Sequence, residues 1–181
     1  MAQEKKKRWF GKEHLNDFKR DASGEYAYQG SHMEYARDEE QWKKEIRYIW
    51  IACVVPAILL LLIGFIPHSG LDGNLLVILP YAAEVIALFI QIWKVVRLSY
   101  GGPKLRKYVH HSTADFLPGI AVVVMITAAF ALAGIIVSMI LKTFNGGTFA
   151  MILYFAAQIC LGIGGWVIFQ LMKKMVWNEL W

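Results

Sequence analysis

The sequence predicts an all-α, polytopic membrane protein with four transmembrane helices in two antiparallel hairpins and with both termini in the cytoplasm. Its composition is the first indication, since 57% of the 181 residues are hydrophobic and 18% are charged, against about 45–50% and about 25% in soluble domains. The second is four apolar stretches, each long enough for a helix rising about 1.5 Å per residue to cross about 30 Å of hydrocarbon. The third is the clustering of basic residues on one side of these stretches.

We expect transmembrane helices at 46–66, 75–96, 116–141 and 148–172. The segment before them, residues 1–45, is expected to be a basic, amphipathic cytoplasmic arm. Its last part, from about residue 34, is rich in helix formers and lacks Gly and Pro, so we predict a juxtamembrane helix that continues into the first span. Within the arm, the turn-like DASG between short alternating stretches predicts a small hairpin at 18–30. Residues 173–181 are expected to be a short cytoplasmic tail.

The topology follows from the loops and their charges. The connections at 67–74 and 142–148 are short and rich in Gly, so each is expected to join an antiparallel pair of helices. Of the 19 Lys and Arg residues, 18 lie on the side that holds the N-terminus, the middle connection and the C-terminus, and only Lys142 lies in a short loop. The positive-inside rule places that side in the cytoplasm, and we expect the protein to be integral to the plasma membrane.

A single carboxylate, Glu84, stands at the midpoint of the second span. It shares a helix face with Tyr81 and Gln91, whose spacing of three and seven residues from Glu84 forms a polar stripe. An ionised carboxylate is costly there, so the side chain must be neutral, paired or directed at a polar path. Two interpretations stay open: a proton-coupling carboxylate on a substrate or ion path, or a neutral group bonded to another helix, with Gln158 and Thr127 as candidate partners.

Small residues share faces on the third and fourth spans and are expected to pack these helices closely, with a homodimer contact as the alternative. They are Ala131, Gly134, Ser138, Gly162 and Gly165. A gapless shift of 74 residues also lays the first hairpin over the second and brings Glu84 onto Gln158. Eight identities in 52 positions leave both an internal repeat and coincidence open.

Two basic clusters are expected to contact anionic headgroups on the cytoplasmic side. Their residues are Lys5, Lys6, Lys7 and Arg8 in the arm, and Lys104, Arg106 and Lys107 in the middle connection. The neighbouring pair His110 and His111 lacks further ligands at metal-site spacing, so no metal is expected. Asp115, followed by Pro118, predicts an acidic cap at the start of the third helix. No RNA-binding signature accompanies the positive charge, and no nucleic-acid partner is expected.

No catalytic motif occurs in the sequence, so we expect no catalytic residues, no cofactor and no enzyme. The interpretation favoured by the charge pattern is an accessory or scaffold subunit of a membrane complex, with the cytoplasmic arm as its partner-binding part. The alternative is a small proton-coupled transporter or channel that uses Glu84 as its coupling group. In either case the expected partners are the lipid bilayer and either another membrane protein or further copies of the chain.

Overall fold

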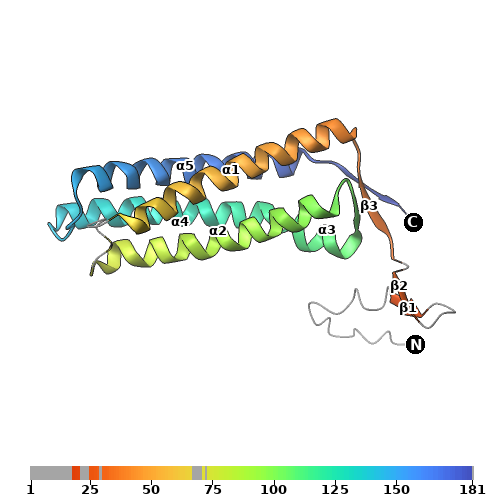
Figure 1. Cartoon of the computed structure of the whole chain (residues 1–181), viewed down its shortest axis with the longest axis horizontal. Coiled ribbons are helices and arrows are strands. Elements are labelled where there is room, and N and C mark those ends of the chain that lie inside the picture. Colours follow the sequence, from red (N-terminus) through yellow and green to blue (C-terminus); the bar gives the residue numbers. More distant parts are fainter. Residues whose placement is uncertain (1–17, 21–24, 29, 67–70, 72, 181) are drawn as a thin grey trace, which may run out of the picture.

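The structure, a computed structural model, describes residues 18–20, 25–28, 30–66, 71 and 73–180. It is mostly helical, and four long helices lie lengthwise in a bundle (Figure 1). These are α1 (Glu39–Phe65), α2 (Leu75–Gly101), α4 (Leu117–Ile140) and α5 (Thr148–Lys174), with a short α3 (Lys107–Thr113) between α2 and α4. Among the residues described, four stretches are long and apolar enough to cross a membrane, and α3 and α4 together form one of them. This confirms the predicted bundle of four apolar helices.

The most extensive helix contacts join the first hairpin, α1 and α2, to the second, α4 and α5, and join α4 to α5 within the second hairpin. Helix α1 packs mainly on α5, α2 packs mainly on α4, and α4 packs on α5. Helices α1 and α2 follow one another in the chain, yet they share the least contact of these four pairs. Around the bundle the order is therefore α1, α5, α4, α2, with α2 and α5 diagonal to each other and the α1–α2 seam the least tightly packed.

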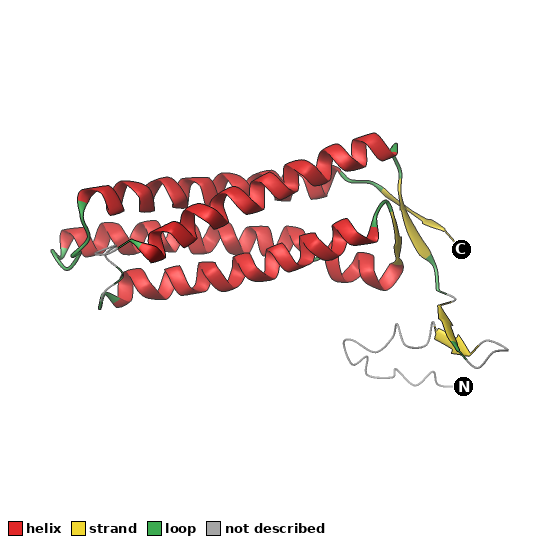
Figure 2. Cartoon of the chain, in the orientation of Figure 1, coloured by secondary structure: helices red, strands yellow, loops and turns green. Residues whose placement is uncertain are grey.

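A three-stranded antiparallel sheet covers one end of the bundle, where Figure 2 shows its strands in yellow. Its central strand is β3 (His32–Tyr35), which pairs with β4 (Lys104–Arg106) on one side and with β5 (Trp177–Leu180) on the other. The sheet thus joins three segments that are far apart in the sequence. They are the end of the arm, the middle connection and the C-terminal tail.

The strand β3 corrects the expectation of a helix from about residue 34. Helix α1 begins at Glu39, and Asp38 before it has extended backbone angles, φ −66° and ψ 159°. Local helix propensity is overridden because β3 finds backbone partners on both sides and buries Tyr35 to 3% exposure. The predicted tail is also more ordered than expected, since α5 runs to Lys174 and β5 follows, so the fold is mostly helical rather than all-α.

Two smaller elements bear on other expectations. The predicted hairpin is present, with β1 (Phe18–Arg20) antiparallel to β2 (Tyr26–Tyr28). The expected acidic cap is wrong, because Phe116 occupies the N-cap position of α4 and its side chain makes no capping bond. Asp115 instead faces back towards α3, where two histidines contact its carboxylate.

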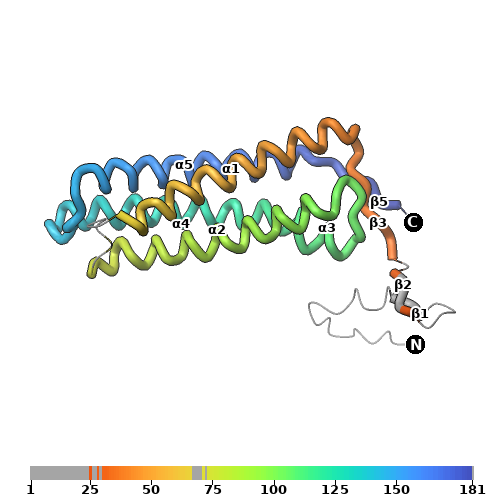
Figure 3. Tube along the Cα trace, in the orientation of Figure 1, coloured from red at the N-terminus to blue at the C-terminus, as the bar shows by residue number. Residues whose placement is uncertain are grey.

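The sheet lies at one end of the bundle, and the start of α2 and the connection after α4 lie at the other (Figure 3). At the end away from the sheet, the Asn74 side chain caps α2 by accepting a hydrogen bond of 3.1 Å from the Leu76 amide. Its amide nitrogen lies 3.4 Å from both the carbonyl and the hydroxyl oxygen of Thr143. This contact ties the connection before α2 to the one after α4.

Candidate functional site

The polar centre of the bundle is a hydrogen bond between α2 and α5. The Gln158 amide nitrogen donates to the Glu84 carboxyl oxygen Oε2 over 3.0 Å. Both side chains are buried, with 0% and 1% exposure. Since α2 and α5 are diagonal and make few other contacts, this bond crosses the interior of the bundle and joins its two hairpins.

The other residues of the expected polar set do not join this pair. Gln91 donates from its amide nitrogen to the Cys53 sulfur over 3.4 Å. The Tyr81 hydroxyl donates to the Leu60 carbonyl oxygen over 3.3 Å. Both of these bonds connect α2 with α1 across the loosely packed seam. Thr127 bonds only to carbonyl oxygens one turn earlier in its own helix, at 3.0 and 3.1 Å.

Three atoms next to this bond have no hydrogen-bond partner among the described residues: the second oxygens of Glu84 and Gln158, and the hydroxyl of Tyr154, one turn before Gln158 in α5. A carboxylate oxygen and an amide oxygen can accept hydrogen bonds but cannot donate them. A proton on Glu84 supplies the donor that these two oxygens lack. The surroundings therefore favour a neutral carboxyl group, which also avoids the cost of a buried charge in the bilayer.

The three glycines expected to pack helices do not share one contact. A Cβ atom on Gly165 would lie 2.8 Å from the Met125 side chain and 3.0 Å from the Ala121 carbonyl, so this glycine lets α5 approach α4. Gly134 instead faces α2, where a Cβ atom would meet the Leu76 carbonyl. A Cβ atom on Gly162 would have nothing within 4 Å.

The two remaining members of that set lie in the bundle interior. Ala131 has 0% exposure and belongs to an apolar cluster with Tyr154 and Ala157 of α5. Ser138 is buried as well, and its hydroxyl donates to the Gly134 carbonyl over 2.7 Å. Both residues therefore serve packing within the chain.

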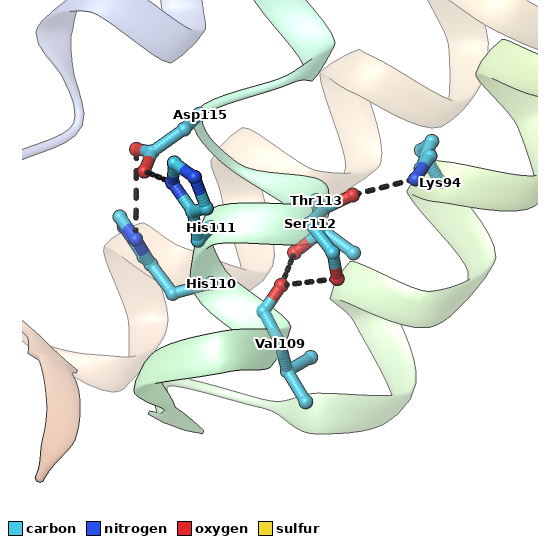
Figure 4. Close-up of polar contacts among 7 residues, drawn as sticks. All are labelled: Lys94, Val109, His110, His111, Ser112, Thr113 and Asp115. Atoms are coloured by element: carbon cyan, nitrogen blue, oxygen red, sulfur yellow. Dashed lines mark hydrogen bonds and ion pairs between the residues drawn. The ribbon is translucent and has the colours of Figure 1, made fainter. Parts of the chain in front are cut away.

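A second polar cluster surrounds α3, as Figure 4 shows. The Asp115 carboxylate lies 2.8 Å from the Nδ1 atom of the exposed His111 and 3.5 Å from that of the buried His110. The Lys94 ammonium group donates to the Ser112 carbonyl over 2.8 Å and so ties α2 to the end of α3. No cluster of three or more potential ligands that could hold a metal ion occurs within the described ranges. The arrangement positions the turn between α3 and α4.

An aromatic cluster holds the sheet onto the bundle. Tyr35, Trp42 and Trp177 contact one another with ring centroids 5.4 to 5.8 Å apart, and the His110 ring lies 4.7 Å from Trp177. Beneath them the buried Glu45 carboxylate accepts hydrogen bonds from three side chains, which belong to Tyr35, Arg37 and Gln41. Burial, reinforced by Glu45, raises the pKa of Tyr35 to about 12, so its hydroxyl keeps the proton that it donates.

We expect Tyr35→Phe to lower the free energy of unfolding by about 1–2 kcal/mol, because a buried charged acceptor loses one of its donors. Thermal unfolding followed by the fluorescence of the adjacent tryptophans measures the change. Tyr100→Phe is the matched control, since Tyr100 is 90% exposed and should tolerate the same loss of a hydroxyl. Equal stability of the two variants would contradict a structural role for the Tyr35–Glu45 bond.

The predicted headgroup contacts are described only in part, because Lys5, Lys6, Lys7 and Arg8 lie outside the described residues. Lys104, Arg106 and Lys107 are exposed at the sheet end. The Lys107 ammonium group pairs with Glu179 over 2.6 Å, and the Arg106 guanidinium lies 5.4 Å from the ring centre of Tyr28. Part of this positive charge therefore holds the sheet together.

Sequence reasoning missed several residues of these clusters. Glu45 lies in the predicted juxtamembrane helix and carries no signal of its own, because its burial depends on a strand that forms only through distant pairing. The glycines within 162–165 favour helix packing, but the sequence does not indicate that Gly164 faces α1, where a Cβ atom would lie 2.5 Å from the Ala52 carbonyl. Tyr154 offered a detectable signal, since it lies four residues before Gln158 and shares its helix face.

No protein family, curated protein or solved structure that was compared with the chain matches it. The geometry of the chain itself therefore carries the functional assignment.

Proposed function

We propose that this multi-pass membrane protein is an accessory or scaffold subunit of a membrane complex, with its termini in the cytoplasm of the cell and its sheet-covered end as the partner-binding part. The observation that carries the proposal is the state of Glu84. Its side chain is fully buried and bonded to Gln158 across the bundle, which is the geometry of a structural tie between helices.

The same observation weighs against the proton-coupled alternative. A coupling carboxylate must reach water from each side of the membrane in turn, whereas Glu84 has 0% exposure and closed helix packing around it. Two hollows lie along the α1–α2 seam, and Glu84 is in the wall of neither. The Gln158 amide donates a hydrogen bond to one Glu84 carboxyl oxygen, so that oxygen does not need a bound ion or substrate as its partner.

The sheet end supports the second half of the proposal. Its strands come from three separate segments, and an aromatic cluster and the buried Glu45 hold them in place. A surface that is ordered before binding loses less conformational entropy on association. The outer strands β4 and β5 also leave backbone groups at the sheet edges, where a partner strand can pair.

Site-specific photocrosslinking in the native membrane tests the scaffold role. A photoreactive residue at Asn178, exposed on β5, is expected to give one discrete adduct with another protein. The same residue at Phe149, which is 71% exposed at the opposite end, should give none and is the positional control. Removal of residues 1–30, which leaves β3 intact, should weaken the Asn178 adduct if the arm contributes to binding.

A flux measurement tests the alternative on the same protein. Vesicles containing the Glu84→Gln variant are expected to show the same proton permeability as wild-type vesicles. Loss of a pH-dependent flux in this variant, with no Asn178 adduct in cells, would replace the scaffold proposal by the transporter.

A further inference from the structure

The seam between α1 and α2 contains two hollows. The one near the sheet has a volume of about 550 Å³, within the range of about 300–1,000 Å³ typical of small-molecule sites. It is lined by Glu39, Trp42, Lys43, Ile46, Arg47, Trp50, Ser99, Gly102 and Pro103. The other lies deeper in the bundle, is apolar and has a volume of only about 50 Å³, and its wall includes Ala57, Leu61, Val85, Phe89 and Ile92.

The two hollows follow one continuous face of each helix. On α1, residues 43, 47, 50, 54, 57 and 61 recur every three or four positions, and on α2 residues 85, 89, 92, 96 and 99 do the same. Between the hollows, the Trp50 indole nitrogen donates to the Ser99 hydroxyl over 2.9 Å and holds the helices together there. We refer to the seam as the α1–α2 groove; the Trp50–Ser99 bond separates its polar mouth from its apolar deeper hollow.

The length of the groove matches one bilayer leaflet. From Trp50 to Leu61 the chain advances eleven residues, or about 16 Å along a helix, and half of the hydrocarbon core measures about 15 Å. Leu61 and Phe89 remain 49% and 72% exposed at its deep end. An extended acyl chain that starts at the mouth therefore reaches the end of the groove near the bilayer centre.

The charges at the mouth favour an anion. Lys43 and Glu39 form an ion pair of 2.8 Å, so they neutralise each other. Arg47 is exposed one turn further into the membrane, and within the described residues no carboxylate pairs with its guanidinium. Arginine recognises phosphate through two parallel hydrogen bonds, and this arginine stands at the headgroup level beside an indole of the interfacial belt.

We propose that the α1–α2 groove is a binding site for one anionic phospholipid, whose phosphate contacts Arg47 and one of whose acyl chains lies between Ala57 and Val85. This lipid fills the seam that helix packing leaves open.

The test is quantification of lipid that stays bound to the purified full-length protein. The protein is extracted from the membrane in mild detergent, and its mass is measured by native mass spectrometry. About one phosphatidylglycerol-class lipid per protomer is expected. Arg47→Gln should lower its occupancy about tenfold, as expected for loss of a charge-assisted hydrogen bond, while Lys44→Gln on the same helix, outside the groove wall, should retain it.

A second pair of variants tests the acyl-chain half of the groove. Ala57→Phe fills the apolar hollow and is expected to displace the lipid although Arg47 remains. Ile58→Phe adds the same ring to the neighbouring lipid-facing position, which is 52% exposed, and should leave the occupancy unchanged. An unaltered gel-filtration profile shows that each variant is folded.

Added lipid distinguishes the source of the phosphate. Detergent micelles that contain phosphatidylglycerol are expected to raise the melting temperature of delipidated protein, those that contain phosphatidylcholine to raise it less, and inorganic phosphate to leave it unchanged. Equal lipid retention in all four variants would overturn the proposal and indicate an unspecific lipid shell. A dimer crosslinked through residue 57 or a protein helix in the groove, with no bound lipid, would overturn it as well.

Discussion

Glu84→Leu is expected to lower the free energy of unfolding by about 1–3 kcal/mol, because it leaves the Gln158 amide buried without an acceptor. Glu84→Gln should cost much less. An amide group, like a neutral carboxyl group, can both accept a hydrogen bond from the Gln158 side chain and donate one to it. Unfolding of the purified protein by a denaturing detergent, at constant lipid content, measures both. If Gln were as damaging as Leu, a neutral Glu84 would be ruled out.

A double-mutant cycle isolates the bond itself. Gln158→Leu leaves the Glu84 carboxyl group without its donor and is expected to be as costly as Glu84→Leu. The double variant places two apolar side chains against each other in the bundle interior, so it should be more stable than the sum of the single losses predicts. Strict additivity would show that the two side chains do not stabilise each other.

Gly164→Val is expected to destabilise the bundle by about 1–3 kcal/mol, the usual cost of overpacking. A Cβ atom there would lie 2.5 Å from the Ala52 carbonyl oxygen of α1, and backbone cannot yield as a flexible side chain can. The two helices would have to separate. Thermal unfolding in detergent, followed by circular dichroism, measures the loss.

Gly162→Val is the matched control, because it makes the same substitution half a turn away in the same helix. A Cβ atom at residue 162 would meet nothing within 4 Å, so only the intrinsic helix propensity changes, and it changes equally in both variants. Similar losses in the two variants would contradict the close approach of α5 to α1.

The membrane-spanning part of the fold could be predicted from the sequence because its signals are local. An apolar stretch long enough to cross a bilayer has few alternatives to a helix, and the helix of Leu75–Gly101 begins at the expected residue. The pairing of Glu84 with Gln158 was among the candidates for a similar reason. A buried polar group in a bilayer needs a polar partner, and few were available at that depth.

The sheet could not be predicted, because none of its strands carries a strong signal of its own. The strand at His32–Tyr35 is four residues long and stands next to helix formers. It becomes a strand only when Lys104–Arg106 and Trp177–Leu180 lie on either side of it. The burial of Tyr35 and Glu45 depends on that pairing, so their roles were equally hidden from a local analysis.

The strand pairing has a consequence for the order in which the protein is made. The central strand β3 emerges first, β4 follows after two helices, and β5 follows after three more. A chain that elongates from its N-terminus cannot complete this sheet until all of the helices between β3 and β5 have been made. Until then β3 keeps one edge unpaired. The sheet can thus form completely only after the four long helices have been made and lie in the bundle that brings β3, β4 and β5 together.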